Sequence, residues 1–535
     1  MIYYKKEKII LKFELSKDNS KLILKESTRE EYNQIRRILC VFVNNYRFTQ
    51  KFKMTSWDGK IDFFNNGFID LGLWNVVYEA CKQYGYKFEI INKEKFPRNN
   101  NIKINDVEDF CKEFYKDHKA KGNVPFFPYE HQIEAVHCIL KHKYGAIEVA
   151  TSGGKSLIFS TIVFYLLKNN PNYKILLIVP SVSLVTQFYD DLLDYNLGFN
   201  KDNLNPLDIK IQEIMSDKPR KNRDDVEPNI YIGTYQSLIN YGTPENQPDF
   251  YKQFNVVCCD EGHKAKSVSI TTIMKRSFGY SDYRFAMSGT FPENNTAERL
   301  SIESVTGPVL KVVKAKELME KGLISHAKIK CLILQHEELE FAQSIHNIKK
   351  NGGGKKAYDL ESQFIQKSEK RKIFVSKLIN KFQHNSLVLF HNIEYGKELY
   401  DYCRSNIINK NFYYIDGSTS SEKRQYIIKQ MENTDGNPNI LVASYGTLST
   451  GVSIKALKNM VMCQPFVSPS LVRQSIGRLL RLHESKSNGE KAIIFDLVDQ
   501  FHHKFKNTLY GQFETRKNKI YIKEEFIFDE TKIVL

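Results

Sequence analysis

The sequence predicts an α/β protein with two tandem domains built on parallel sheets, preceded by a small α+β domain. Its 535 residues allow roughly three to four domains. From about residue 125, apolar strand-like runs alternate with segments of helix length, and a second series starts near residue 386. Strands that alternate with helices predict a parallel sheet covered on both faces. We place the domains at residues 1–115, 116–325 and 326–535.

The first domain differs in pattern from the rest of the chain. Short strand-like stretches at 9–13 and 21–24 precede a helical stretch at 29–42 and further short aromatic strands. The polar segment 92–105 has the composition of a linker. These features predict a small α+β domain, joined to the next unit by a helix near residues 108–118.

Each of the two alternating series contains five apolar runs that we expect to be strands. In the first series the apolar runs lie at 146–150, 175–179, 229–233, 255–259 and 284–288. In the second they lie at 386–390, 412–416, 440–444, 459–463 and 492–496. Between the series, residues 336–372 are polar and include Asn351-Gly352-Gly353-Gly354, so we expect an exposed loop before a helix there.

Composition excludes several classes of protein. Hydrophobic residues make up 41% of the chain and aromatic residues 13%, which indicates folded rather than disordered domains. The longest apolar runs are far shorter than the ~20 residues of a membrane span, and the N-terminus lacks the apolar core of a signal peptide. Nine cysteines without a C-x-x-C pair fit neither a disulfide scaffold nor a zinc site. We therefore expect a cytoplasmic protein.

The net charge of +16 has two interpretations. A polyanionic partner would be attracted to such a surface, but a solvated basic surface on a lysine-rich protein is an equally good explanation. The first 100 residues carry 19 Lys and Arg against 12 Asp and Glu. The stretch Tyr46 to Lys60 mixes basic and aromatic side chains and holds Arg47, Lys51, Lys53 and Trp57. These residues suit contacts with a nucleic-acid backbone and its bases. The alternative is that the aromatic side chains form the core of a small domain and the lysines its solvated face.

A candidate phosphate loop follows the strand at 146–150. Its residues are Thr151, Ser152, Gly153, Gly154, Lys155 and Ser156, and a helix starts at about residue 157. In such loops backbone N–H groups and the helix N-terminus face a phosphate, the Lys reaches the β- and γ-phosphates, and the Ser hydroxyl holds Mg²⁺. The strict six-residue spacing would put a glycine at position 149, which is Val. The alternative is a chance Gly-Gly-Lys-Ser turn.

Two adjacent carboxylates, Asp260 and Glu261, follow the strand at 255–259. In phosphoryl transfer to water one carboxylate holds the Mg²⁺ shell and a second positions or deprotonates the attacking water. A plain helix cap would explain an isolated pair, but the phosphate loop in the same sheet favours the catalytic interpretation. We therefore expect Lys155 and Glu261 to be catalytic, with Ser156 and Asp260 as the Mg²⁺ ligands.

Two more segments fit a nucleotide site. Ser288-Gly289-Thr290 follows the strand at 284–288. In the second α/β domain Gln474, Arg478 and Arg481 are spaced i, i+4 and i+7, which predicts one helix face. This face is either solvated or carries arginines that neutralise a γ-phosphate across a domain cleft.

Together these segments resemble the motifs of superfamily 2 helicases, in the family's order, over residues 125–500. Gln132 resembles the adenine-reading Gln of the Q motif, and Asp260 to His263 a DEAH box with Gly in place of Ala. Segments 179–187 and 233–237 resemble strand-binding motifs, and 444–454 and 474–481 resemble motifs V and VI. The chain is most similar to the UvsW type of tailed-phage helicase, which also has an N-terminal domain with a Trp-Asp-Gly element, here Trp57-Asp58-Gly59.

The resemblance implies two RecA-like domains and a set of functional residues. ATP and Mg²⁺ are the implied cofactors. It adds Gln132, Gly451, Ser453, Gln474, Arg478 and Arg481 to the nucleotide-binding residues. His263, Ser288, Gly289 and Thr290 would couple the nucleotide to the DNA face. The implied DNA contacts are Pro180, Ser181, Gly233, Thr234 and Gln236, to which we add Thr447.

The function expected from this resemblance is ATP-dependent remodelling of branched DNA in phage recombination, repair and replication. A double-strand translocase or an RNA-directed helicase of the same superfamily is the main alternative, and a non-enzymatic nucleic-acid-binding protein is the second. Expected partners are branched or single-stranded DNA and replication or recombination proteins, but no membrane. A monomer is expected, with the oligomeric state left open.

Overall fold

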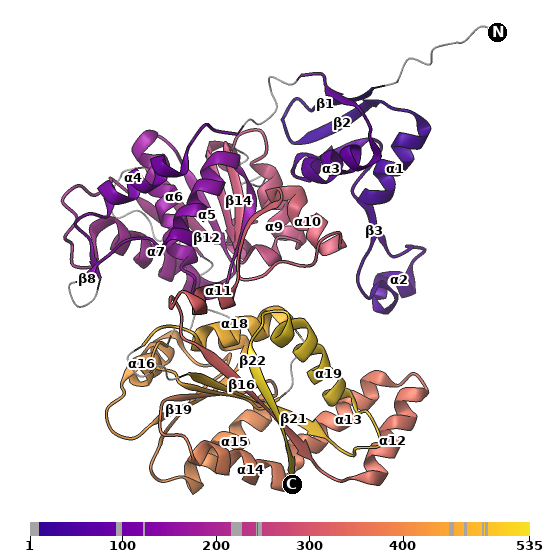
Figure 1. Ribbon diagram of the computed structural model, residues 1–535, viewed down its shortest axis with the longest axis vertical. Helices are drawn as coiled ribbons and strands as arrows, with labels where there is room; N and C mark the ends of the chain where they lie inside the picture. Colours follow the sequence, from indigo (N-terminus) through magenta and orange to yellow (C-terminus); the bar gives the residue numbers. More distant parts are fainter. Residues whose placement is uncertain are drawn as a thin grey trace. The chain divides into compact units, whose positions relative to one another are not determined.

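The computed structural model describes residues 10–92, 99–120, 124–215, 227–241, 243, 249–448, 454–464, 468–483, 486 and 491–535. These residues form two compact units. The first unit contains residues 1–149 and 154–313, and the second contains residues 314–535 with 150–153. Figure 1 shows the N-terminal domain and the first α/β domain within the first unit, and the other α/β domain in the second. In the described part of the chain no helix is both long and apolar enough to cross a membrane.

The N-terminal domain has a four-stranded mixed sheet in the order β5-β2-β1-β6. Its strands are β1 (Leu11–Leu15), β2 (Lys21–Glu26), β5 (Phe68–Asp70) and β6 (Phe88–Ile90). The helices α1 (Arg29–Leu39) and α3 (Trp74–Tyr84) complete the domain. Thr28 starts α1 because its Oγ1 accepts from Glu31 N at 3.2 Å while the Glu31 carboxylate accepts from Thr28 N at 2.7 Å. The predicted small α+β domain is thus confirmed.

This domain packs closely on the first α/β domain. A Cβ atom on Gly72 would lie 2.1 Å from the carbonyl oxygen of Glu303, so only glycine allows the two backbones to approach. Leu300 belongs to the hydrophobic core cluster of the N-terminal domain. Lys275 Nζ lies 2.8 Å from Asp70 Oδ2. Backbone, core and charge contacts therefore join the two domains into one unit.

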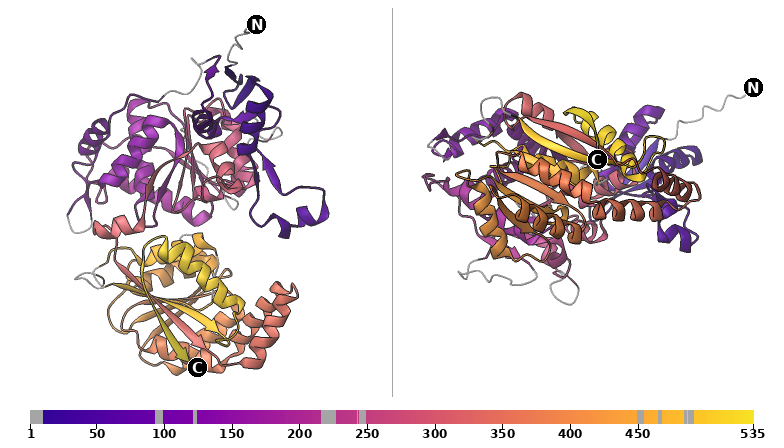
Figure 2. Two further views of the ribbon diagram at one scale, coloured as in Figure 1. Left: turned by 45° about the vertical axis from the view of Figure 1, so that its right-hand side comes forward. Right: turned by 90° about the horizontal axis from the view of Figure 1, so that it is seen from below.

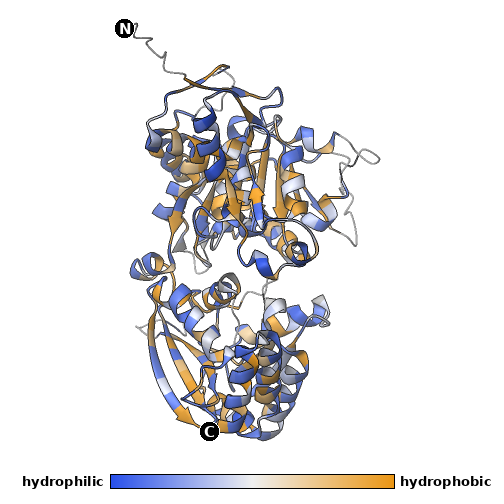
Figure 3. Ribbon diagram, turned by 90° about the vertical axis from the view of Figure 1, so that its right-hand side faces the viewer, coloured by the Kyte–Doolittle hydropathy of each residue, from blue (hydrophilic) through white to orange (hydrophobic). Residues whose placement is uncertain are grey.

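The first α/β domain has a seven-stranded sheet in the order β11-β12-β10-β13-β14-β9-β15, and every pair is parallel. Its strands are β9 (Tyr144–Val149), β10 (Ile175–Val179), β11 (Ile211–Ile214), β12 (Ile230–Thr234), β13 (Val256–Asp260), β14 (Tyr283–Ser288) and β15 (Val309–Val313). The helices around it are α4 (Ile104–Phe114), α5 (Glu130–His142), α6 (Lys155–Asn169), α7 (Val182–Leu197), α9 (Val268–Arg276) and α10 (Ala297–Thr306). Figure 3 shows hydrophobic colouring on the central strands, as expected for a sheet buried on both faces.

The second α/β domain repeats this architecture, with the strand order β18-β19-β17-β20-β21-β16-β22 and parallel pairs throughout. Its strands are β16 (Ala327–Gln335), β17 (Ser386–Phe390), β18 (Asn411–Ile415), β19 (Asn439–Ser444), β20 (Asn459–Met462), β21 (Ala492–Gln500) and β22 (Ile527–Val534). Helices such as α15 (Ile393–Asn406), α16 (Ser421–Glu432) and α19 (Thr508–Arg516) flank the sheet (Figure 2). Both predicted parallel-sheet domains are therefore confirmed.

The exposed loop predicted for residues 336–372 is wrong. This segment forms α12 (Leu339–Lys350) and α13 (Gly354–Lys367), and α14 (Glu369–Asn380) begins within it. Ala342 and Ile365 are buried in a small cluster with Phe501 and Leu509 of the same unit. The few apolar residues that form this contact are diluted by charged residues, so the composition resembled a loop. Gly352, with φ +80°, makes the turn between the helices.

A buried ion pair stabilises the second α/β domain. Arg371 of α14 and Asp499 of β21 are both fully buried, and Arg371 Nε lies 2.8 Å from Asp499 Oδ1. His336 Nε2 lies 2.9 Å from the same oxygen, and Tyr395 OH accepts from Arg371 Nη1 at 2.6 Å. Burial alone would raise the pKa of Asp499, but Arg371 and His336 lower the pKa to about 2.

Replacing Asp499 by Asn is expected to reduce the free energy of unfolding by about 3–5 kcal/mol, because Arg371 would remain buried without its counter-charge. Folding lowers the pKa of Asp499, so its charge stabilises the protein above the unfolded value of about 3.9 and this contribution is lost as the pH falls toward the folded value. Urea unfolding at pH 7 and between pH 5 and 3 measures both effects. Asp529→Asn is the control, since Asp529 pairs with Lys328 at the surface; an equal loss in both variants would contradict the prediction.

Candidate functional site

The predicted phosphate loop connects β9 to α6. Ser152 and Gly154 have positive φ values of 72° and 81°, and Gly153 N donates to Ala150 O at 2.9 Å. This tight turn brings the chain to Gly154, which is the N-cap of the fifteen-residue helix α6, and Lys155 and Ser156 form its first turn. A glycine-containing turn that leads into a helix N-terminus presents backbone N–H groups to an anion.

Gln132 lies against this loop. Its side chain is 4% exposed, and its Oε1 accepts from Tyr129 N at 2.8 Å at the start of α5. A Cβ atom on Gly154 would lie 2.1 Å from Gln132 Nε2, so the amide nitrogen occupies the space that glycine leaves open. The structure thus brings the predicted adenine-reading residue into contact with the predicted phosphate loop.

Two residues of α7 that the sequence did not single out lie near Ser156. The Ser156 side chain acts to lower the pKa of both Asp191 and Tyr195. Burial raises the pKa of the Asp191 carboxyl, and Ser156 opposes this shift. Nothing in the local sequence distinguishes Asp191 from the other aspartates of this helix; only the packing of α7 on α6 identifies it.

The carboxylates lie at the carboxyl end of β13, in the same sheet as the loop. Asp260 is the last residue of the strand and is 4% exposed. Burial and the adjacent Glu261 raise the pKa of Asp260, and Lys155 acts in the opposite direction, which places the lysine close to this carboxylate. The loop after β9 and Asp260 at the end of β13 therefore lie at the carboxyl edge of one parallel sheet.

The Asp260 side chain fits an Mg²⁺ ion. Its Oδ1 atom is buried and has no hydrogen-bond partner. An unsatisfied buried carboxylate oxygen is unfavourable by itself, and hard cations such as Mg²⁺ take this type of ligand. Among the described residues no group of three or more His, Cys, Asp and Glu could hold a metal. An ion at Asp260 would thus depend on a nucleotide and on Ser156 for further ligands.

Glu261 begins a chain of polar contacts that leads away from the carboxylates. Its φ is +51°, a left-handed conformation that is unfavourable for Glu and is typical of functional sites. His263 Nδ1 lies 3.3 Å from Glu261 Oε2 and 3.0 Å from Ser288 Oγ. Ser288 Oγ donates to Thr290 O at 2.8 Å, across Gly289. The four predicted coupling residues therefore form a continuous path from Glu261 to the end of β14.

Gly262 occupies the position where the related motif has Ala. A Cβ atom there would lie 2.7 Å from the Cβ of Ala286 and 3.1 Å from the ring of Phe291. The backbone of this turn therefore packs directly on β14, which explains the departure from the motif.

Gly262→Ala is expected to destabilise the protein by about 1–3 kcal/mol through overpacking, and to slow ATP turnover because Glu261 and His263 would shift with the turn. Urea unfolding and steady-state ATPase assays measure the two effects. Gly354→Ala is the matched control, since a Cβ atom there meets no atom within 4 Å. Wild-type stability and turnover in Gly262→Ala would show that the turn tolerates the methyl group.

The predicted strand-binding residues of the first domain lie side by side. Pro180 and Ser181 follow β10, and Gly233 and Thr234 end β12; the two strands pair in register at Val179 and Thr234. Thr234 is 4% exposed, and its hydroxyl caps α8 (Tyr235–Leu238) by accepting from Ser237 N at 3.3 Å. Its hydroxyl is therefore committed to the fold. The half-exposed Ser181 and the exposed Gln236 remain accessible at this edge.

The residues of the second α/β domain lie at corresponding strand ends. Thr447 is on α17 (Tyr445–Leu448), where it is 4% exposed and its hydroxyl lies 2.7 Å from Ser444 Oγ. Gly451 and Ser453 lie outside the described residues. Gln474 and Arg478 are half-buried on α18 (Pro469–Leu479). Their contact with a γ-phosphate stays a prediction.

The single helix face predicted for Gln474, Arg478 and Arg481 is wrong for the third residue. Helix α18 ends at Leu479, and Leu480 N donates to Gly477 O in a tight turn. Lys486 Nζ donates to Leu479 O at 2.9 Å and so satisfies a carbonyl at this helix end. Arg481 follows the turn, where the helical spacing no longer applies.

The basic and aromatic stretch of the N-terminal domain forms a projecting arm, defined here as residues 40–62 (Figures 1 and 2). Strands β3 (Cys40–Phe42) and β4 (Lys60–Asp62) pair as its stem. A short 3₁₀ turn at Tyr46–Phe48 and the helix α2 (Gln50–Met54) form its end. A Cβ atom on Gly59 would lie 2.0 Å from the Tyr46 ring, which explains the glycine of the Trp-Asp-Gly element.

The aromatic residues of the arm divide into two groups. Tyr46 stacks on Phe42 with ring centroids 5.0 Å apart and meets Phe52 edge-on at 4.9 Å, so these rings form the arm's own core. Trp57 is held by a hydrogen bond of 2.7 Å from its Nε1 to Lys60 O and is covered by Lys51 at 4.8 Å. Phe48 and Met54 are 78% and 81% exposed. Phe48 is one of the aromatic residues of the predicted stretch, whereas Met54 was not predicted. Both are accessible apolar side chains at the arm's end.

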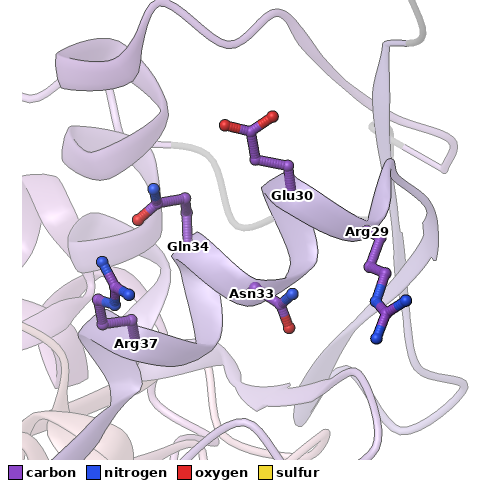
Figure 4. A pocket seen from close by; sticks show the side chains of 5 residues that line it. All are labelled: Arg29, Glu30, Asn33, Gln34 and Arg37. Carbon is purple, nitrogen blue, oxygen red and sulfur yellow. The ribbon is translucent and has the colours of Figure 1, made fainter.

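A second basic surface lies on α1. Arg29, Glu30, Asn33, Gln34 and Arg37 line a hollow of about 380 Å³. All five come from one helix, and Figure 4 shows their side chains pointing in different directions. This arrangement does not converge on a ligand, so we assign it no role.

Three protein families match successive parts of the chain. Residues 10–91 match the family "DNA helicase UvsW, N-terminal", residues 126–293 match "Type III restriction enzyme, res subunit", and residues 369–483 match "Helicase conserved C-terminal domain". The first match covers the domain with the arm. The other two cover the phosphate loop with its carboxylates and the helix with Gln474 and Arg478.

Individual proteins agree with this assignment. The "ATP-dependent DNA helicase uvsW" of Enterobacteria phage T4 is 28% identical over 478 residues, which span 88% of this chain and 87% of that protein. Among solved structures, the DUF1998 helicase MrfA bound to DNA superposes with a TM-score of 0.55 at 14% identity, covering 81% of this chain and 53% of MrfA. That likeness supports the fold alone. Together with the nucleotide-site geometry, these matches show that the chain belongs to the UvsW-like superfamily 2 helicases and is an ATP-dependent DNA helicase.

Proposed function

We propose that this helicase uses ATP hydrolysis to remodel branched DNA, such as forks, junctions and displacement loops, in phage recombination, repair and replication. The observation that supports this best is the path from Glu261 through His263 and Ser288 to Thr290. It starts at the nucleotide-site carboxylates and runs along the sheet edge that also carries Ser181 and Gln236.

The nucleotide site supplies the chemistry. Lys155 and backbone N–H groups of the loop would hold the phosphates, and Ser156 and Asp260 would hold Mg²⁺. When bound, the ion would neutralise charge on the β- and γ-phosphates. Glu261 accepts a proton from the attacking water, because a carboxylate kept ionised by His263 and Lys155 can act as a base. The pKa of Glu261 is accordingly lowered: burial raises it, but the His263 and Lys155 side chains outweigh burial.

The coupling path can report the state of the nucleotide. His263 contacts both Glu261 and Ser288. A change at the γ-phosphate that moves Glu261 would therefore break one of these contacts and leave the imidazole ring with Ser288. Two alternative partners make this element able to adopt two arrangements, which is what a population shift needs. Ser288 then transmits the change to the backbone at Thr290. DNA contacts at Pro180, Ser181, Gly233 and Gln236 would be made mainly to phosphates, because a motor must act on any sequence.

The arm gives a reason to favour branched DNA. Arg47, Lys51, Lys53 and Lys60 all belong to the arm, and Arg47, Lys51 and Lys60 lie 5.7, 4.8 and 4.7 Å from the rings of Tyr46, Trp57 and Phe42. Cations on a rigid aromatic scaffold attract a phosphate backbone. Exposed Phe48 and Met54 side chains suit insertion between unpaired or unstacked bases, which occur at a branch. We propose that the arm holds the branch point.

Arm variants are expected to separate these two contributions. Arg47→Ala, Lys51→Ala and Lys53→Ala combined should weaken binding to all DNA and reduce the log–log salt slope by about 2–3. Phe48→Ala with Met54→Ala should weaken binding to forked DNA by about tenfold or more, and to blunt duplex much less. Fluorescence anisotropy between 50 and 300 mM salt measures both. An equal loss on fork and duplex in the apolar variant would contradict the branch assignment.

ATP hydrolysis and unwinding assays on matched substrates test the proposed function. We expect turnover to be stimulated by DNA, and forked DNA to be unwound in preference to forked RNA and blunt duplex. Preference for forked RNA would support an RNA-directed helicase, and stimulation by duplex without unwinding would support a double-strand translocase. DNA binding without any ATP turnover would support the non-enzymatic alternative.

A further inference from the structure

We propose that the cavity between the N-terminal domain and the first α/β domain binds a carboxylate attached to an aromatic or apolar body, with Arg284 as the residue that pairs with the anion. This inference does not rest on the proposed function. The cavity is built by contacts within the first unit alone.

The cavity has a volume of about 470 Å³. Leu71, Trp74 and Tyr78 contribute to its wall from the N-terminal domain, and Tyr144, Arg284 and Leu310 from the α/β domain. This volume lies in the range of small-molecule sites, which are mostly apolar with a few polar groups. The lining has this character, with one guanidinium among aromatic and aliphatic side chains.

Arg284 is buried without a counter-charge. It is 3% exposed on β14, and its guanidinium lies 3.7 Å from the ring centroid of Phe278 and 4.5 Å from that of Tyr144. Its Nε is buried without a hydrogen-bond partner, and no ion pair involves its side chain in the described part of the chain. Asp70 contributes to its field, but the Asp70 carboxylate is paired with Lys275 at 2.8 Å. A buried cation in this state is unfavourable unless a ligand or the aromatic rings compensate for the lost hydration.

The chain treats its other buried arginines differently. Arg371 and Arg516 are 0% and 1% exposed, and each is paired at 2.8 Å with a buried carboxylate, Asp499 and Asp496. Those carboxylates raise the pKa of both guanidinium groups, whereas burial lowers the pKa of Arg284 to about 10. Arg299, 8% exposed, is likewise paired with Glu303 at 2.6 Å. Arg284 thus lacks the carboxylate that is supplied to the three other buried arginines of the described residues. We infer that a ligand supplies it.

The surroundings select the class of anion. Arg284 is the charged group of the wall, since burial and Lys141 lower the pKa of His142 and leave its ring neutral at pH 7. One cation matches a singly charged carboxylate better than a phosphate dianion. Trp74, Tyr78 and Tyr144 provide flat surfaces for the body of the ligand, and His142 and Asn75 can add hydrogen bonds. The ligand can be a free aromatic acid or the C-terminal residue of a peptide, since both present this chemistry.

The cavity is remote from the nucleotide-binding edge along the sheet. Arg284 and Tyr144 are paired at the amino ends of β14 and β9, whereas the phosphate loop follows the carboxyl end of β9. Changes at Arg284 therefore need not disturb ATP hydrolysis. Because residues of both domains line the cavity, a bound ligand would strengthen the contact between the N-terminal domain and the first α/β domain. This contact fixes the position of the arm.

Thermal unfolding of the full chain with indole-3-acetate tests the proposal. We expect the Tm of the wild type to rise with probe concentration, and Arg284→Met to bind at least tenfold more weakly by calorimetry. We also expect Arg284→Met without probe to be at least as stable as the wild type, because it removes an unpaired buried charge. Arg371→Met is the matched control and should unfold at a lower temperature, since it leaves the buried Asp499 carboxylate without its guanidinium partner. ATP turnover should be unchanged in Arg284→Met.

Three further probes define the ligand. A Gly-Gly-Phe peptide with a free carboxylate and its amide distinguish a peptide C-terminus from a free acid; binding of the free-carboxylate form alone supports the peptide source. Stronger binding of adenosine monophosphate than of either carboxylate would overturn the class of anion. The proposal fails if no carboxylate probe raises the Tm, or if Arg284→Met is destabilised and still binds the probe like the wild type. The first outcome would show that the cavity binds no carboxylate, and the second would show that the role of Arg284 is purely structural.

Discussion

Glu261→Gln is expected to bind ATP as the wild type does and to lose ATP turnover by about 10²–10⁴-fold, the range that a general base contributes. The amide keeps the size of the carboxylate and can still accept from a neighbour, but it cannot take a proton from water. Glu261 adopts a left-handed backbone conformation beside the buried Asp260. Because Gln has the same size as Glu, we expect the substitution to leave this turn in place while it removes one negative charge. Equilibrium binding of a fluorescent ATP analogue and single-turnover hydrolysis separate the two steps.

A surface carboxylate gives the control for this variant. Glu113 lies 2.9 Å from Lys168 with 67% of its side chain exposed, and Glu113→Gln should hydrolyse ATP at the wild-type rate. Removing the Glu261 charge should also alter the His263 contact, so DNA stimulation of any residual turnover is expected to disappear. A Glu261→Gln protein that hydrolyses ATP like the wild type would falsify the assignment of the base.

Lys155→Ala is expected to weaken ATP binding by about 10–150-fold, corresponding to the 1.5–3 kcal/mol of a hydrogen bond to a charged group. Turnover should fall further than binding, because the lysine also neutralises charge that develops on the transferred phosphoryl group. Lys155 is the first residue of α6 and acts electrostatically on both Asp260 and Glu261, so its loss also leaves these carboxylates less compensated. Calorimetry with ATP and steady-state turnover measure the two effects.

The other end of the same helix provides the matched control. Lys168 belongs to the last turn of α6 and pairs with Glu113 at the surface, so Lys168→Ala should keep wild-type ATP affinity and rate. Lys155→Arg is a stricter comparison, since it retains the charge but changes the shape of the donor. Full ATP affinity in Lys155→Ala would move the phosphate site away from this loop.

Much of the fold was predictable because it depends on local patterns. The strands at 175–179 and 255–259 are continuous apolar runs, and the structure places β10 and β13 there, paired and fully buried. The helices at 339–367 were missed because their buried residues are few and widely spaced among charged ones. They are helical because those few side chains meet Phe501 and Leu509, which lie far along the chain.

In the candidate site, too, some features were predictable from the sequence and others were not. A phosphate loop after a strand and a carboxylate pair after another strand predict a shared edge, since parallel strands end on the same side. The end of α18 before Arg481 was not predictable from the spacing, because a tight turn at Leu480 interrupts a pattern that would otherwise continue. Gly262 was recognised as a departure from its motif, but only the position of Ala286 explains it.

By itself the sequence determined many of the strands and helices of the two α/β domains. It also determined that the phosphate loop, the carboxylate pair and the coupling Ser-Gly-Thr segment would lie along one sheet edge. These properties follow from hydrophobic periodicity and from backbone chemistry over a few residues. Only the tertiary structure decided which distant side chains are neighbours: Gln132 with Gly154, His263 with Ser288, and Arg284 with an aromatic cavity instead of a carboxylate. Such contacts depend on how whole elements pack, and the free energy of that packing is spread over many residues, so no local pattern records it.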